Sequence, residues 1–372
     1  MKATDRPGEG PAPGEDGIAA TVRETELCHI VASAVGDAVA GAAMLASGCA
    51  AAGTPYHVTT VRTREELRSR LASVDSDAGA VVVGADTPEA PAVAGRSVSE
   101  RAHRIASELG ATPDPSLALA GIVAAGVDPA DAAPTLLERA DADPTPGVAI
   151  PTADLADGLA HTTLVHADFS GERQRVTAEL DELGDDPDPR RVASLLALAT
   201  AGPDAASTRS ATAVERAIHP YRTPGPFSTA GGYADVLSAL ARRSPGLALS
   251  LAMAGERRSA ALSAWRERAV RTHEAVRSAD IERYDGLVVA RVDGPVAPVA
   301  RLVRDFRSPE PVALAVADGE AAIATAETDV GESIEAAANA ASGSGLGHGN
   351  RGYARFAADE TATFVDAVRG NT

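Results

Sequence analysis

The chain has 372 residues, of which 45 % are hydrophobic, an ordinary share for a folded protein. Acidic residues number 52 and basic residues 34, so the net charge is −18 at neutral pH. The periodic apolar content excludes a mostly disordered chain, and two cysteines are too few for a disulfide scaffold. This length predicts two domains, or three small ones.

The amino-terminal part alternates between strand and helix signals. Residues 1–17 are rich in Pro, Gly and acids, and we expect a flexible leader there. Ser97 and Glu100 have the spacing of a capping box at the start of a helix. The expected strands are 27–33, 57–61 and 80–84, and the expected helices are 38–52, 64–74, 97–109 and 115–125. This order predicts a doubly wound α/β domain with a parallel sheet over residues 18–145.

The rest of the chain divides into a helical region and a second α/β unit. Residues 146–280 have helical periodicity and form a connector, with one long helix over 256–279 that contains the only tryptophan, Trp265. Residues 281–372 predict a smaller carboxy-terminal α/β domain. Its expected strands are 286–292, 312–316 and 351–356, and its expected helices are 296–304 and 329–341.

The charged residues are unusual in kind. Lys2 is the only lysine, and the other basic residues are all arginines. Acid excess with few lysines and aromatics resembles the proteins of salt-adapted archaea, because carboxylates hold water at molar salt. At such ionic strength the Debye length is about 3 Å, so the acidity does not exclude a nucleic-acid partner. We expect no membrane segment and no signal peptide, and therefore a cytoplasmic protein in which Cys28 and Cys49 are small buried residues.

The glycine-rich segment 342–352 (SGSGLGHGNRG) is the most informative stretch. It lies between a predicted helix and a predicted strand, where a flexible backbone can approach a phosphate and present N–H groups to it. His348 and Arg351 could add polar or cationic contacts to the same anion. The alternative is a long linker, and the spacing alone does not separate the two.

The tail from Asp329 to Phe356 resembles the DHHA1 substrate-binding domain of the DHH phosphoesterase superfamily. Those domains place a Gly-Gly-His loop between a helix and a strand. Gly347 and His348 match the Gly-His pair, Gly345 matches an upstream glycine, and Arg351 replaces a small residue. The whole arrangement is similar to the RecJ-like single-strand nucleases and most of all to their divergent archaeal relatives, a group that includes Cdc45.

The chain departs from this family at the metal ligands. The family holds two Mn²⁺ or Mg²⁺ ions with Asp and His side chains, and the ions activate water for phosphodiester hydrolysis. The Asp-x-Asp-Gly motif is replaced here by residues 33–36, and no Asp-His-His occurs. Asp37 and Asp86 are the remaining candidates for catalytic carboxylates, and two carboxylates do not make such a site. We therefore expect a retained fold, no bound metal and a loss of the two-metal chemistry.

Three other patterns have two interpretations each. Asp154, Asp157 and His161 share a helix face, with His166 and Asp168 nearby, and could hold a metal, although acids at a helix start and packed histidines are favoured. Tyr233 could stack on a base but is more typical of a core aromatic. The arginines could hold phosphates, although a solvated helix face is favoured for most. They are Arg257, Arg258, Arg266, Arg268, Arg271, Arg277, Arg301, Arg304 and Arg307.

The resemblance implies a protein of DNA replication or repair that binds single-stranded DNA or RNA without conventional cleavage. Its contacts would be Gly345, Gly347, His348 and Arg351, and the replication complex GINS is an implied partner. One alternative is an active single-strand exonuclease that uses Mn²⁺ or Mg²⁺ in a rearranged site. Another is a protein-interaction module without nucleic-acid binding.

Overall fold

The computed structural model describes residues 15–75, 77–95, 97–184, 186–201, 208–325 and 329–370. Most of the expected leader lies outside these residues. Its last three residues do not fit the prediction, because they belong to helix α1 (Glu15–Glu24). Ile18, Ala19 and Val22 of this helix are fully buried in the amino-terminal core, which explains why the chain is already helical there.

A four-stranded parallel sheet organises the amino-terminal part. Its order is β2-β1-β3-β4, with β1 (Cys28–Ser33), β2 (Tyr56–Val61), β3 (Gly79–Val83) and β4 (Ala92–Val93). Val81 and Val83 face helices α2 (Gly36–Ala52) and α4 (Val98–Glu108), while Val82 faces α3 (Arg64–Ala72). Both faces are thus covered, which explains the continuously apolar β3 and the largely apolar β1.

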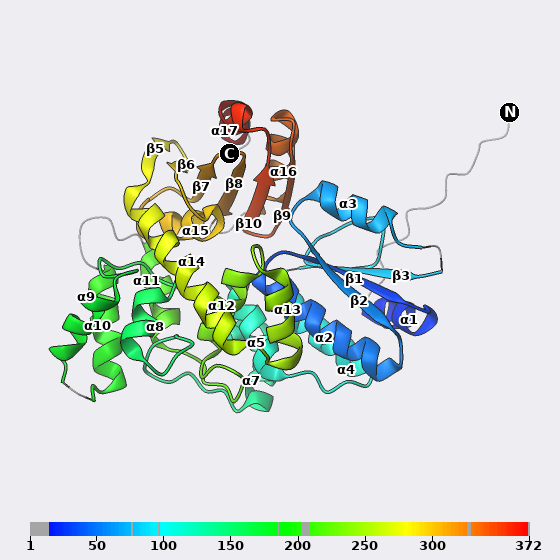
Figure 1. The fold of residues 1–372 in the computed structure, drawn as a ribbon, viewed down its shortest axis with the longest axis horizontal. Helices are drawn as coiled ribbons and strands as arrows, with labels where there is room; N and C mark the ends of the chain where they lie inside the picture. The colour runs from blue at the N-terminus through cyan, green and yellow to red at the C-terminus, as the bar shows by residue number, and fades with distance from the viewer. Residues whose placement is uncertain are drawn as a thin grey trace.

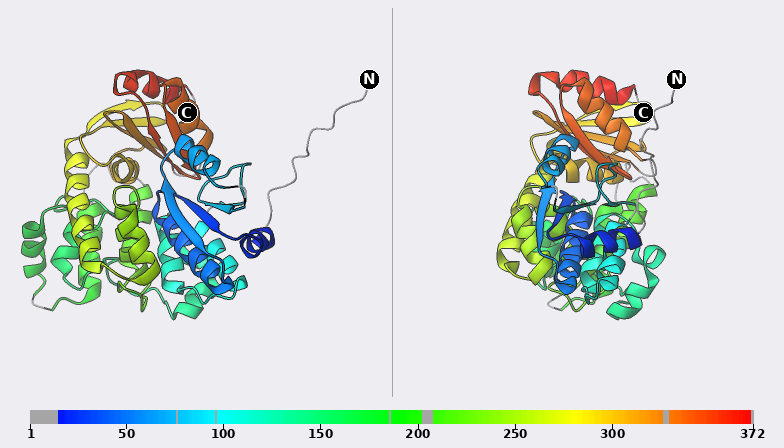
Figure 2. Two further views of the ribbon diagram at one scale, coloured as in Figure 1. Left: turned by 45° about the vertical axis from the view of Figure 1, so that its right-hand side comes forward. Right: turned by 90° about the vertical axis from the view of Figure 1, so that its right-hand side faces the viewer.

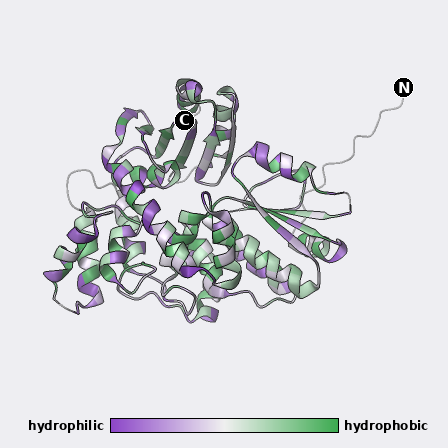
Figure 3. Cartoon of the chain, viewed as in Figure 1, coloured by the Kyte–Doolittle hydropathy of each residue, from purple (hydrophilic) through white to green (hydrophobic). Residues whose placement is uncertain are grey.

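Small residues let the central helices approach each other closely. A side chain at Gly48 of α2 would come within 2.9 Å of Leu109 and 3.0 Å of Ala106. Cys28 and Cys49 are buried beside this contact, as predicted. Helices α5 (Pro115–Ala124), α12 (Ala230–Leu240) and α13 (Pro245–Ala254) complete the same core. Figure 3 shows that hydrophobic residues predominate in these central helices.

The middle of the chain is helical, as expected, and the predicted long helix is α14 (Arg258–Ser278). Trp265 is fully buried, and its indole Nε1 donates to the carboxylate of Asp235 at 2.8 Å. Tyr233 is 1 % exposed, which confirms the prediction of a core aromatic. The remaining helices are α6 (Pro129–Ala132), α7 (Pro134–Ala140), α8 (Leu155–His161), α9 (Arg173–Asp181), α10 (Pro189–Ala201) and α11 (Thr208–Ile218).

The carboxy-terminal part is a six-stranded mixed sheet in the order β5-β6-β7-β8-β10-β9. Only β6 and β7 pair in parallel. One face packs on α16 and α17, and the other on α14 and α15. The bounds are β5 (Asp280–Tyr284), β6 (Leu287–Arg291), α15 (Val296–Phe306), β7 (Val312–Ala317), β8 (Glu320–Thr325), α16 (Gly331–Ala340), β9 (Ser344–His348), β10 (Arg351–Arg355), a 3₁₀ turn (Ala358–Glu360) and α17 (Thr361–Arg369).

Two local predictions were wrong. The glycine-rich segment is neither an open loop nor a linker, because β9 and β10 form an antiparallel hairpin that turns at Gly349, where φ is 59°. The expected capping box is also absent, since the Ser97 side chain makes no cap hydrogen bond. The carboxylate of Asp37 on α2 takes that role.

The overall class agrees with the prediction: a parallel-sheet α/β part, a helical connector and a smaller carboxy-terminal sheet part (Figures 1 and 2). The domain limits at 145 and 280 stay predictions. Among the described residues, no helix has both the length and the apolar character that crossing a bilayer requires.

Candidate nucleic-acid interface

Asp37, a candidate catalytic residue, is 5 % exposed and holds a helix end. Its two carboxylate oxygens accept hydrogen bonds from the backbone N–H groups of Val98 and Ser99, both at 2.9 Å. These are free N–H groups at the start of α4, where a negative charge also complements the helix dipole. Asp37 is therefore committed to joining α2 and α4.

Asp86, the other candidate, lies after β3 and is exposed. Its backbone carbonyl accepts a hydrogen bond from Arg64 at 2.6 Å. Ser33, where the family motif begins, donates through Oγ to the Gly84 carbonyl at 2.8 Å. Two divalent cations need several converging carboxylate or imidazole ligands. The described residues contain no group of three His, Cys, Asp or Glu side chains that could hold a metal, so the donor set does not fit the family's ions.

The second possible metal cluster consists of ion pairs and a helix cap. Asp154 caps α8 by accepting from the Asp157 N–H at 2.9 Å. The Asp157 carboxylate receives two hydrogen bonds from Arg266, each 2.8 Å, and lies 3.2 Å from His161 Nδ1. Burial alone would raise the pKa of Asp157, but the Arg266 hydrogen bonds and charge outweigh it, and the pKa is lowered. The positions of these acids in the first turn agree with the favoured interpretation.

The glycines predicted to approach a phosphate approach protein atoms instead. A side chain at Gly345 would lie 2.8 Å from the Ile334 carbonyl oxygen of α16, and one at Gly347 would lie 2.9 Å from the Ile334 side chain. Glycine is thus required for the hairpin to pack on α16. The side chain of His348 lies outside what the structure describes.

Arg351, on β10, connects the carboxy-terminal part to the central helices. Its guanidinium donates to the carbonyl of Ala124 at the end of α5, at 2.7 Å. Its Nε is buried without a hydrogen-bond partner among the described residues. Desolvation by burial, with the nearby charges of Arg301 and Arg304, lowers the pKa of Arg351 to about 9. This arginine is still charged at neutral pH.

A second group of arginines lies where the three parts of the chain meet. The guanidinium of Arg242, just after α12, stacks at 3.8 Å over the ring of Tyr353 on β10. The Tyr353 hydroxyl donates to Glu320 at 2.6 Å, and Arg243 pairs with the same carboxylate at 3.4 Å. Arg268 of α14 lies close enough for its charge to interact with Arg242. We call Arg242, Arg268, Tyr353 and Glu320 the arginine junction.

The guanidiniums of the arginine junction have more N–H donors than the carboxylate of the junction accepts. Arg242 and Arg268 are half-buried, and within the described part of the chain neither guanidinium donates a hydrogen bond. Desolvation by burial lowers the pKa of each to about 10, so both are charged at neutral pH. Arg62, two residues before α3, and Glu66 on α3 border the same group and pair with each other at 2.9 Å. Two charged guanidiniums with unused donors form a binding surface for an anion.

Most other predicted arginines have structural roles. Arg277, Arg301 and Arg307 donate to main-chain carbonyls of the connector, and Arg304 donates to Asp305 and to the Thr325 carbonyl. The sequence pattern pointed to Arg268 but not to Arg242 or Arg243. Their only signal is an Arg-Arg pair after an apolar helix, which equally indicates a helix end.

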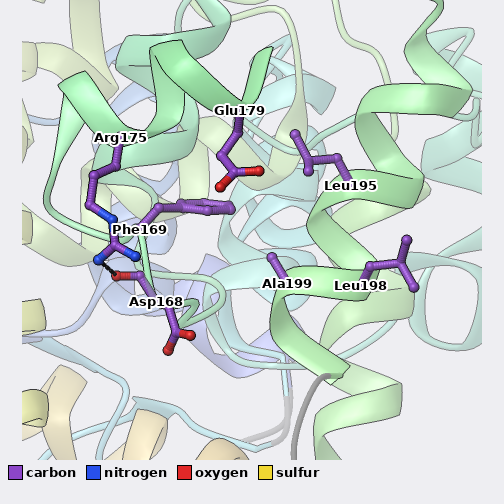
Figure 4. Close-up of a pocket in the computed structure, with 7 residues that line it drawn as sticks. All are labelled: Asp168, Phe169, Arg175, Glu179, Leu195, Leu198 and Ala199. Carbon is purple, nitrogen blue, oxygen red and sulfur yellow. Dashed lines mark hydrogen bonds between the residues drawn. The ribbon is translucent and has the colours of Figure 1, made fainter. Parts of the chain in front are cut away.

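A pocket of about 340 Å³ lies elsewhere, in the helical arm of α9 and α10 (Figure 4). Arg175 in this pocket donates to the carbonyl of Asp168 at 2.8 Å and lies 3.6 Å from Glu172. Leu198 at its edge is 75 % exposed. The Arg175 guanidinium thus already has partners, and the pocket is not part of the arginine junction.

Comparison with solved structures shows the fold. Cdc45 from Entamoeba histolytica superimposes with a TM-score of 0.58 and 10 % identity over 95 % of this chain and 97 % of that one. RecJ from Thermus thermophilus, solved with Mn²⁺, gives a TM-score of 0.44 and 14 % identity over 98 % of this chain and 55 % of its own. The Cdc45 comparison confirms the fold that the resemblance predicted.

Sequence comparison shows the family. A family model described as "Uncharacterized protein rrnAC1427, C-terminal domain" matches residues 279–370. The uncharacterized protein rrnAC1427 of Haloarcula marismortui is 44 % identical over 391 residues, which cover 99 % of each chain. This chain therefore belongs to the rrnAC1427 family, and it has a Cdc45-like fold.

Proposed function

We propose that this protein binds single-stranded DNA or RNA in replication or repair, and that it does so without two-metal hydrolysis. The observation that carries the proposal is the arginine junction, where Arg242 and Arg268 are charged, half-buried and without hydrogen-bond acceptors among the described residues. Phosphodiester oxygens supply both the charge and the acceptors that these guanidiniums lack.

Neighbouring groups suit an extended anion better than a small one. The ring of Tyr353 is 3 % exposed and lies under the Arg242 guanidinium, so it positions this cation and leaves its N–H donors for a phosphate. On the same strand, Arg351 follows the hairpin turn that carries His348. We propose that a strand runs from the arginine junction towards His348 and Arg351, with Gly345 and Gly347 shaping the hairpin. GINS enters as a proposed partner, supported by the fold that the chain shares with Cdc45.

Fluorescence anisotropy with a labelled single-stranded oligonucleotide tests the binding site. Arg242→Gln and Arg268→Gln are each expected to weaken binding about tenfold, since a charged hydrogen bond contributes about 1.5 kcal/mol. Each should also reduce the slope of log affinity against log salt by about 1. Arg190→Gln on α10 removes the same charge from an exposed position far along the chain and serves as the matched control. Equal affinity in all three variants would contradict the proposed site.

A further inference from the structure

A small polar contact joins α3 to the carboxy-terminal part. Arg64 donates through Nε and Nη2 to the carboxylate of Glu335 on α16, at 3.1 and 2.7 Å. The next residue, Glu65, donates its backbone N–H to Ser344 Oγ on β9 at 3.0 Å. The Arg64 and Glu335 side chains are 19 % and 25 % exposed, so water reaches both partners. We call these contacts, together with Leu346, the latch.

Leu346 is the only apolar member of the latch. It is 7 % exposed and packs on the face of the parallel sheet that α3 covers. It is the one residue of the carboxy-terminal sheet in this core, among the buried residues that the structure describes. The others are Val31, Val61, Leu67, Val82 and Ala85. Separation of the latch would therefore remove one leucine from this core.

The opposite side of the carboxy-terminal part is held far more firmly. There α14 continues directly into β5, and α15 packs against both α14 and the sheet. One continuous apolar core contains residues of the connector, α14, α15 and four strands of the sheet. Figures 1 and 2 show α3 beside β9 and α16, with α14 and α15 at the other side of the sheet. Between the two attachments, Arg351 also donates to the Ala124 carbonyl, and this hydrogen bond must break when the parts separate. The two attachments differ in strength, and the latch is the weaker one.

The arginine junction lies between these two attachments. Arg62 and Glu66 of the α3 side interact with Arg242, and Arg64 of the latch is only two residues from each of them. Arg242 also stacks on Tyr353 of the carboxy-terminal sheet. Because elements of all three parts surround the guanidiniums, a polymer that contacts them needs the parts to separate, and the latch separates most easily.

We propose that the latch opens and closes about the α14–α15 side and thereby controls access to Arg242 and Arg268. That the ligand is a single-stranded nucleic acid rests on the proposed function. The opening of the latch does not depend on that ligand, so the motion and the ligand can be tested separately.

Labelling of arginines with phenylglyoxal, followed by peptide mass spectrometry, measures access without any nucleic acid. Arg64→Ala is expected to raise the labelling rates of Arg242 and Arg268 about threefold to tenfold. Arg68→Ala, on the same helix, removes only a surface pair with Glu89 at 3.8 Å and should leave both rates unchanged. Arg190 provides the internal reference within each sample. Equal rates in wild type and Arg64→Ala would overturn the proposal.

A locked variant tests closure directly. Glu65→Cys with Ser344→Cys places two thiols across the latch for a short bismaleimide, while the native Cys28 and Cys49 are buried and protected. Crosslinking should lower the labelling of Arg242 and Arg268, and should slow association with a circular single-stranded oligonucleotide, which has no end to thread. Unchanged labelling after crosslinking would overturn the latch. Labelling that responds to the lock in a protein that binds no oligonucleotide would support the latch and refute the proposed function.

Discussion

Asp37 illustrates how a residue's place in the sequence and its role in the structure can differ. In the sequence it directly follows residues 33–36, the positions compared with the Asp-x-Asp-Gly motif. In the structure both of its carboxylate oxygens are used by the N–H groups that begin α4. The capping of α4 therefore explains a buried acid at this position.

Replacement of Asp37 is therefore expected to affect stability. Asp37→Ala leaves two buried N–H groups without acceptors and should lower the free energy of unfolding by about 2–3 kcal/mol. Asp86→Ala, at an exposed position, should change it by less than about 0.5 kcal/mol. Urea titration measures both values. A comparable loss in the two variants, or a Mn²⁺-dependent stabilisation that only Asp37→Ala abolishes, would contradict the capping role.

His166 and His273 form a pair of hydrogen-bonded imidazole rings. Their Nδ1 atoms lie 3.0 Å apart, and His273 Nε2 lies 3.0 Å from the carbonyl of Thr162, so Nε2 donates and its Nδ1 accepts. Desolvation by burial lowers the pKa of His166 to about 4 and that of His273 to about 3. Both rings are neutral at neutral pH.

This pair predicts a loss of stability in acid. Between pH 6.5, the ordinary histidine pKa, and about pH 4, the unfolded chain binds protons that the folded protein does not. The stabilising effect of the neutral pair is complete above pH 6.5 and declines as the pH falls through that range. His273→Gln should flatten the dependence of the unfolding free energy on pH between 6.5 and 4. The hypothesis fails if the variant and the wild type have the same slope there.

Among the helices and strands, the sequence periodicity predicted those whose conformation depends on their own residues. The strands β1, β3, β6 and β7 are short apolar runs, and β2 is rich in β-branched residues. All five lie where their patterns placed them. β8 is alanine-rich, which locally favours a helix, and becomes a strand through pairing with β7 and β10. β9 contains glycines, which strands disfavour, and its conformation depends on α16. Such tertiary causes leave no local signal.

The hairpin glycines allow a test of why they are glycines, either because the hairpin packs on α16 or because a ligand approaches the backbone. Gly345→Ala should lower the free energy of unfolding by about 1–3 kcal/mol, because its side chain meets the backbone of Ile334. Gly349→Asn should cost less than about 1 kcal/mol, since its surroundings are open and asparagine tolerates a positive φ. Thermal unfolding compares the two. If Gly345→Ala is as stable as wild type, packing does not explain this glycine.

For the whole molecule, the sequence and the family resemblance predicted the order of an α/β part, a helical connector and a smaller carboxy-terminal part. They did not predict the contacts between these parts. Arg64 and Glu335 are 271 residues apart, and Arg242 and Tyr353 belong to different parts. The sequence therefore predicted an interface on the hairpin at Arg351, while the arginines with unused donors lie beside it. Residue type identified arginines as candidates, and only the fold separates those bonded to carbonyls from those without acceptors.

The net charge of −18 predicts dependence on salt for the whole chain. Repulsion among the excess carboxylates destabilises the compact state at low ionic strength, and salt screens it. The melting temperature should therefore rise between dilute buffer and molar KCl, as differential scanning fluorimetry can measure. A melting temperature that is independent of KCl would contradict salt adaptation.

Binding and cleavage of a single strand can be followed in one tube. Purified protein in molar KCl with Mn²⁺ is incubated with 5′-labelled single-stranded DNA, and anisotropy and gel electrophoresis are recorded on the same sample. We expect binding that Arg242→Gln and Arg268→Gln weaken, with no shortening of the DNA. Metal-dependent shortening that Asp37→Ala or Asp86→Ala abolishes would contradict the account and establish an exonuclease with a rearranged site.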